Sequence, residues 1–285
     1  MLASRMVVGT LLISLGLWPS QASAGWVIDQ VVKATGTPQQ VVIEDNRMKI
    51  TTMGKDGKPA NAAVIDAGAQ TFTQIDYGEK QYISASTEEY ARMIQGAQKA
   101  LAPKMAEVQQ KMQEKMKNMP PEQRKLLEQK LNAQMGNLFQ DPKDCPEPPK
   151  VELRKTEQQE TIAGFKTVRY DLMSNGKIDA EIWVAKEIAV GEDLDPQKMQ
   201  QFTAEMTKLI PCGGGQGKNG PLGNDPVWKV AREGYPVRTV DHSSGKEAKP
   251  MVEVVKAEQK TVPATEFQPP TGFTRKELPH AAAKP

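Results

Sequence analysis

The stretch 86–136 constrains the fold most, because it separates two segments of the opposite local preference. It is rich in Ala, Gln, Glu, Lys, Leu and Met and contains almost no β-branched residues, a composition that favours helix. The segments on either side are rich in Val, Ile and Thr, which favour strands. We therefore expect two β-sheet blocks with a helical insertion between them.

The insertion has the signals of a helical hairpin. Ser86 followed by Glu89 is a capping-box pattern that starts a helix. Apolar residues then recur with a period close to 3.5, and Pro103 is expected to kink this arm or to split it into two helices. Pro120 and Pro121 end the first arm, and a second apolar stripe continues to Leu138. The sequence thus predicts an inserted hairpin at 86–138.

Short segments separated by turn residues predict antiparallel strands in both flanking blocks. Met48 and Ile50 fall on one face of their strand, predicted to be dry, and Arg47 and Lys49 fall on the other, predicted to be wet. A second helix is expected at 195–210, with an apolar stripe that includes Phe202. The predicted strands are 26–33, 40–44, 47–53, 62–66, 71–75, 81–85, 151–161, 166–173, 178–185, 227–231, 235–241 and 251–260.

The N-terminal residues have the layout of a secretory signal peptide. Arg5 precedes a short apolar run, and small residues at Ala22 and Ala24 fit a cleavage site near Ala24–Gly25. The run is shorter than the roughly 20 residues that span a bilayer, so a permanent anchor is the less favoured alternative. We expect a signal peptide at 1–24, a soluble periplasmic product without a membrane span, a single domain at 25–278 and a disordered tail at 279–285.

Composition disfavours nucleic-acid binding and catalysis. The chain has 37 basic and 35 acidic residues, and only 5% of its residues are aromatic, so it lacks the one-sided basic surface and the stacking platforms that nucleic acids require. With two histidines and no Ser-His-Asp set, we expect no catalytic residue, no cofactor and no enzymatic activity.

Cys145 and Cys212 are the only cysteines. Each follows a predicted helix in a turn bounded by proline, and an exported chain meets an oxidising compartment. We expect a disulfide between them with a structural role. A metal site is not predicted, because two thiols without a nearby histidine make a poor ligand set.

The insertion is unusually rich in methionine. Met105, Met112, Met116 and Met119 share one helix face, and thioethers are soft ligands suited to Cu(I). The alternative is that methionine serves as a flexible apolar filler or a contact surface for a partner. Both interpretations stay open from the sequence.

Four short motifs resemble a known family when they are taken in order along the chain. They are TIAGFK at 161–166, EIWVA at 181–185, GYPV at 234–237 and FQPPTGF at 267–273. The set resembles the bacterial domain of unknown function 4412, which has no established activity. The resemblance implies an α+β fold similar to the lipoprotein carriers LolA and LolB: a curved antiparallel sheet, forming an incomplete barrel, covered by helices.

These observations favour a non-catalytic periplasmic carrier for a hydrophobic ligand, such as an acyl chain or the lipid of a lipoprotein. The first alternative is an interaction module that contacts another envelope protein through the Met-rich hairpin, and the second is copper handling through methionines. The candidate ligand-binding residues are Met48, Ile50, Tyr82, Trp183, Met105, Met112, Phe202 and Met206.

Overall fold

The computed structural model describes residues 24–94, 96, 150–208, 230–243 and 248–278, and their strands form a single open sheet of 12 strands. The strand order is β12-β6-β5-β4-β3-β2-β1-β11-β10-β9-β8-β7. All neighbouring strands are antiparallel except β12 and β6. The strands are β1 (Ala24–Val32), β2 (Thr37–Glu44), β3 (Arg47–Met53), β4 (Pro59–Asp66), β5 (Thr71–Asp76), β6 (Gln81–Ser86), β7 (Val151–Ile162), β8 (Phe165–Ser174), β9 (Lys177–Ala185), β10 (Tyr235–Asp241), β11 (Lys249–Thr261) and β12 (Thr274–Arg275).

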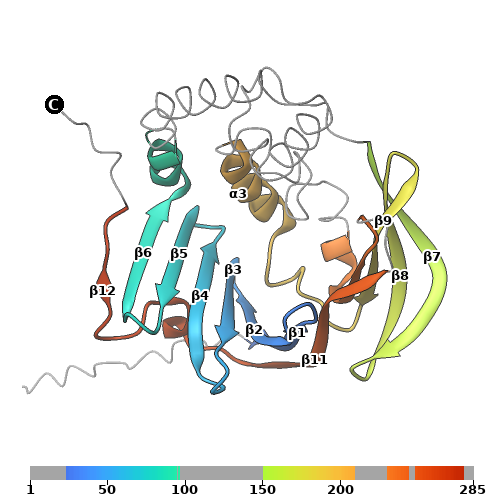
Figure 1. Cartoon of the computed structure of the whole chain (residues 1–285), viewed down its shortest axis with the longest axis horizontal. Helices are drawn as coiled ribbons and strands as arrows, with labels where there is room; N and C mark the ends of the chain where they lie inside the picture. The colour runs from blue at the N-terminus through green and yellow to red at the C-terminus, as the bar shows by residue number, and fades with distance from the viewer. Residues whose placement is uncertain (1–23, 95, 97–149, 209–229, 244–247, 279–285) are drawn as a thin grey trace, which may run out of the picture.

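The sheet bends so that its two ends rise on either side of helix α3 (Pro196–Lys208), as Figure 1 shows. We call the face that carries α3 the concave face and the opposite one the convex face. β1 pairs with β2 on one side and with β11 on the other. This central position of β1 merges the two blocks of strands that the sequence separates.

The predicted α+β architecture is wrong. The described chain is one open sheet, not an incomplete barrel plugged by helices, and its described helical segments are 87–94 with residue 96, α3, a turn at 230–233 and a short 3-10 helix at 264–267. No long hairpin occurs among the described residues, and from residue 97 onward the predicted hairpin at 86–138 lies outside them. Helical segments are short among the described residues, and the β1–β11 pairing joins the two strand blocks into one open layer.

Several local predictions are confirmed. The helix after β6 begins at Thr87, and its capping box is formed: the Ser86 amide donates to Glu89 Oε2 (2.8 Å) and the Glu89 amide donates to Ser86 Oγ (3.2 Å). The helix expected at 195–210 is α3. Within the described ranges, no helix has the length and apolar character needed to cross a membrane.

The strand predicted at 227–231 is wrong in its described part. Val230 and Ala231 belong to the helical turn at 230–233, and the amide of Gly234 donates to the carbonyl of Val230 (3.2 Å). Val230 is buried against Tyr170 and Ile182 of the outer strands. The short Val-rich sequence is therefore used to pack a turn onto the sheet and not to extend it.

The convex face of β1 to β4 is also buried in part, which corrects the predicted wet face of β3. Val27, Val42 and Val64 form a cluster there with residues of the C-terminal segment, including Phe267 of η3 (Ala264–Phe267). Lys49 is only 6% exposed, because its ammonium group bonds to that segment. Phe267 and Phe273 thus place the segment 267–273 over this cluster.

Candidate ligand-binding face

A row of apolar side chains crosses the concave face from β1 to β6. Each member lies directly opposite the next in the antiparallel register, so all of them project from the same face. The row consists of Trp26, Ile43, Met48, Ile65, Phe72 and Ala85. We call it the apolar row. With neighbouring strands about 4.8 Å apart, its five steps span about 24 Å.

A second row beside it is apolar over its first four strands. It runs from Ile28 through Val41 and Ile50 to Ala63, and then reaches the exposed Gln74. The two rows together form an apolar surface on the concave side of β1 to β4. Ile28, Val41 and Ile43 are at most 2% exposed, so this surface is the floor of the main core.

A polar line borders this surface. Gln30 Nε2 donates to Gln39 Oε1 (3.1 Å), Gln39 Nε2 donates to Thr52 Oγ1 (3.4 Å), and the hydroxyl of Tyr235 donates to Gln30 Oε1 (3.1 Å). Burial raises the pKa of Tyr235 strongly, so its hydroxyl stays protonated and acts as a donor. The line therefore limits the width of the apolar surface.

Helix α3 covers part of the apolar surface. Met199 and Phe202 are 1% and 4% exposed and belong to the same cluster as Ile28 and Ile43. Their spacing of three residues places them on one helix face. Met48, Ile50, Phe72 and Met206 pack against this cluster but are only half-buried. The edge of the seam between α3 and the sheet thus retains accessible apolar side chains.

Five of the predicted ligand-binding residues come together around one core cluster. Trp183 and Phe202 are members of it, and Met48, Ile50 and Met206 pack against it. Tyr82 lies apart from them, packed against the convex cluster. Met105, Met112, Cys145 and Cys212 lie outside the described residues, so the disulfide and the methionine site stay predictions.

Trp26 is a candidate site residue that was not predicted from the sequence. Its side chain is 7% exposed, belongs to the same cluster, and finds no hydrogen-bond partner for Nε1 among the described residues. Phe72 was missed as well; its ring meets that of Tyr90 edge-to-face with centroids 5.6 Å apart. The sequence did contain one signal, the strand register: counting outward from the Asp45–Asn46 turn pairs Ile43 with Met48. No neighbouring turn residues, however, indicate that Trp26 pairs with Ile43.

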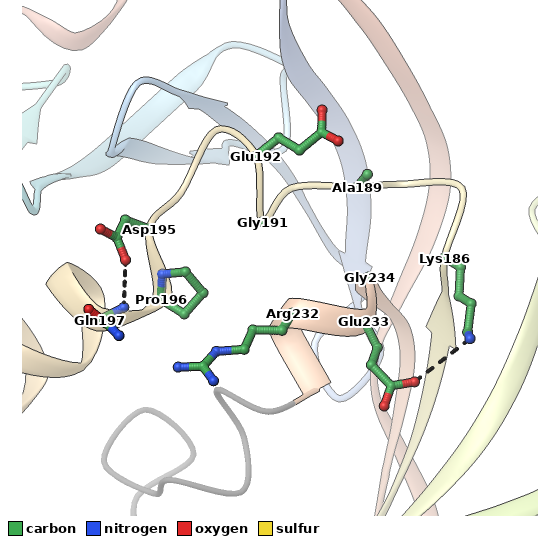
Figure 2. A pocket seen from close by; sticks show the side chains of 10 residues that line it. All are labelled: Lys186, Ala189, Gly191, Glu192, Asp195, Pro196, Gln197, Arg232, Glu233 and Gly234. Atoms are coloured by element: carbon green, nitrogen blue, oxygen red, sulfur yellow. Dashed lines mark hydrogen bonds and ion pairs between the residues drawn. The ribbon is translucent and has the colours of Figure 1, made fainter.

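A separate, polar pocket of about 510 Å³ lies where α3 begins. Figure 2 shows side chains of both charge signs around it, with Arg232 extending toward Pro196 and Gln197. Asp195 Oδ1 accepts a hydrogen bond from the backbone N–H of Gln197 (2.8 Å) and so caps α3. This pocket lies outside the apolar row.

Glu233, which lines this pocket, is held by a neighbouring network. The hydroxyl of Tyr170 donates to its carboxylate, and Lys155 Nζ lies 3.3 Å from Oε2. The hydrogen bond from Tyr170 is the main reason that the pKa of Glu233 lies below its usual range. Lys186 Nζ is 3.9 Å away from the same oxygen. Glu233 thus ties β7 and β8 to the turn at 230–233.

The described ranges contain no group of three or more His, Cys, Asp or Glu side chains placed to hold a metal ion. A charged network on the outer strands instead consists of fixed ion pairs. Arg154 and Arg169 each lie 2.7 Å from the buried Asp171, and Arg169 and His242 lie 3.1 Å and 2.9 Å from Glu181. Burial alone would raise the pKa of Asp171, but hydrogen bonds from the two arginines lower it below its usual range.

The fold and the site define a protein built on a single, mainly antiparallel sheet, with a helix on one face and a C-terminal segment on the other. A family model described as "Domain of unknown function (DUF4412)" matches residues 84–273, and the chain belongs to this family. The resemblance carried by the four motifs is therefore confirmed.

Other comparisons add little about function. No curated protein sequence matches the chain. A crystal structure of an uncharacterized conserved protein from Thermus thermophilus is similar with a TM-score of 0.41 and 8% identity, covering 90% of this chain and 91% of that chain. The comparisons do not confirm a likeness to LolA and LolB.

Proposed function

We propose that this protein is a non-catalytic binding protein that carries an elongated hydrophobic ligand, an acyl chain or the lipid of a lipoprotein, along the concave face of its sheet. The observation that carries the proposal is the apolar row, which continues across six strands and keeps Met48 and Phe72 half-buried against the core cluster. A row of this shape accommodates an elongated ligand better than a compact one.

The energetics are adequate for such a ligand. Each buried methylene contributes about 0.8 kcal/mol, so a dozen would contribute on the order of 10 kcal/mol before the cost of ordering the complex. The half-buried methionines at the seam have flexible, polarisable side chains that adapt to ligands of variable shape. These properties favour a carrier of acyl chains over a binder of one rigid compound.

Export to the periplasm is part of the proposal. β1 begins at Ala24, next to the expected cleavage site, so the mature domain would start directly with a central strand. Intact-mass measurement on protein recovered from the periplasmic fraction tests this part. A mature chain that begins at Gly25 or close by supports it, and a chain that retains residues 1–23 in the cytoplasm contradicts it.

Ligand binding is tested by native mass spectrometry on the exported protein and by displacement of a fluorescent fatty-acyl probe. Met48→Gln places a polar amide at the seam, whereas Met251→Gln makes the same change in β11, where the side chain is 44% exposed. We expect Met48→Gln to weaken probe binding about tenfold and Met251→Gln to leave it unchanged. Apo protein in every mass spectrum and no displaceable probe binding would refute the carrier function.

The two alternative functions depend on the Met-rich stretch. Contact with another envelope protein and copper binding through Met105, Met112, Met116 and Met119 stay predictions, because these residues lie outside the described part of the chain. Deletion of 97–138 separates them from the carrier function. Loss of a partner or of Cu(I) binding with unchanged acyl-probe binding would favour the corresponding alternative.

A further inference from the structure

One end of the apolar row carries a buried hydrogen-bond donor that no described residue satisfies. Trp26 is 7% exposed, and its indole Nε1 has no hydrogen-bond partner in the part of the chain that the structure describes. Buried polar groups are paired in nearly all native structures, so each exception calls for an explanation. Tyr235, a second aromatic donor at the border of the apolar surface, follows the rule by donating to Gln30 Oε1.

The position of Trp26 in the sheet places this donor at one end of the apolar row. Along the row toward β6, its neighbours are apolar through Ile43, Met48, Ile65, Phe72 and Ala85. On its other side, Trp26 lies opposite Gln259 of β11, which is exposed and polar. Trp26 therefore stands at the boundary between a long apolar row and a polar end.

An acyl group likewise consists of a long apolar part followed by a polar end. Its hydrocarbon tail is apolar throughout, and it ends in a carbonyl oxygen that accepts hydrogen bonds. The apolar row, about 24 Å long, is comparable in length with a long-chain acyl tail. A pure hydrocarbon would leave the indole N–H unpaired, whereas an acyl carbonyl placed at Trp26 would satisfy it.

We propose that Trp26 Nε1–H is the recognition donor for the carbonyl oxygen of an acyl ester or amide, whose tail lies along the apolar row toward β6 in place of the α3 side chains Met199 and Phe202, which cover the row in the free protein. This inference rests on the proposed carrier function and makes it specific. The ligand is selected by its carbonyl group as well as by its tail, and it binds in one orientation.

The test compares two probes of equal tail length, methyl tetradecanoate and methyl tetradecyl ether, as competitors of a fluorescent fatty-acyl probe. We expect the wild-type protein to bind the ester about tenfold more tightly than the ether, since only the ester offers a carbonyl. In Trp26→Phe the ratio of the ester affinity to the ether affinity should fall to about one, while the ether still binds. Tyr170→Phe, which removes a buried donor far from the row, should keep the preference.

A second variant guards against a folding defect in Trp26→Phe. Benzothienylalanine incorporated at position 26 keeps the shape of the indole but replaces N–H with sulfur, so it should also abolish the ester preference. Equal affinity of the wild type for ester and ether, or a preference that survives both changes, would overturn the role of Trp26 and leave the carrier function standing. Failure of both probes to bind would instead refute the carrier function itself.

Discussion

Lys49 Nζ lies 2.8 Å from Glu266 Oε1 and 2.9 Å from the carbonyl oxygen of the same residue, although the two residues come from opposite ends of the domain. Lys49 is 6% exposed. The pair fixes η3 against β3 and so holds the C-terminal segment over the convex cluster. Nearby, the guanidinium of Arg47 lies 4.5 Å from the centre of the Phe267 ring and reinforces the same contact.

Removing Glu266 should destabilise the protein more than removing Lys49. Glu266→Ala leaves a buried ammonium group with one carbonyl partner, and we expect the free energy of unfolding to fall by about 1–3 kcal/mol, limited by the partial exposure of Glu266. Lys49→Met replaces the charge with an apolar side chain of similar length and should cost less. Urea denaturation measures both. A larger loss for Lys49→Met would show that the pair itself, and not the stranded charge, dominates.

Gly234 should not tolerate any side chain. Its φ is +150°, and a Cβ at this position would lie 2.2 Å from the carbonyl oxygen of Ala185. We expect Gly234→Ala to lower the free energy of unfolding by more than about 2 kcal/mol. Gly36→Ala is the matched control, because its φ is +67° but nothing lies within 4 Å of the new Cβ. It should cost about 1–2 kcal/mol, and equal losses in thermal unfolding would contradict the steric argument.

Asp193 should make stability fall as pH rises. Burial first, and then the charges of Glu44, Glu192 and Asp45, raise the pKa of Asp193 above its usual value. Because the folded-state pKa is the higher one, ionisation opposes folding, and stability decreases between the unfolded-state and folded-state pKa. We expect Asp193→Asn to be more stable than the wild type at neutral pH. The difference should vanish in acid, and a constant difference across the pH range would contradict the prediction.

Tyr235→Phe should destabilise the protein through Gln30. The substitution removes the donor to Gln30 Oε1, and Gln30 is only 9% exposed. Leaving a buried carbonyl without its partner costs about 1–2 kcal/mol. Tyr77→Phe is the control, since Tyr77 contacts Phe273 through its ring, with centroids 5.5 Å apart. We expect Tyr77→Phe to change the free energy of unfolding little in chemical denaturation. Equal losses for the two variants would show that the effect does not come from the hydrogen bond to Gln30.

Turn chemistry was the most reliable part of the sequence-based prediction. Asp45 and Asn46 have φ values of 46° and 60°, and Asn175 and Gly176 have φ values of 50° and 80°. Positive values at both central residues are what two-residue hairpins require. Because a hairpin turn fixes the register of the strands it joins, the pairs β2–β3 and β8–β9 followed from residues that are adjacent in sequence.

Prediction failed where the answer depended on contacts between distant segments. Lys49 was predicted to face water because it alternates with apolar residues, but a segment more than two hundred residues away covers it. Val230 and Ala231 were predicted as part of a strand, but both lie in a helical turn, where Val230 packs against Tyr170 and Ile182 and Ala231 packs against the main core.

By itself, the sequence determined the family through its ordered motifs. It also determined most strands, helix α3 and the capping box of the helix at Thr87, because each of these depends on interactions within a few residues. Tertiary structure alone decided that β1 pairs with β11, which makes one open sheet of the two blocks. The same pairing set Trp26 at the end of the apolar row. Such pairings depend on which distant strand buries which face, and local sequence does not encode that choice.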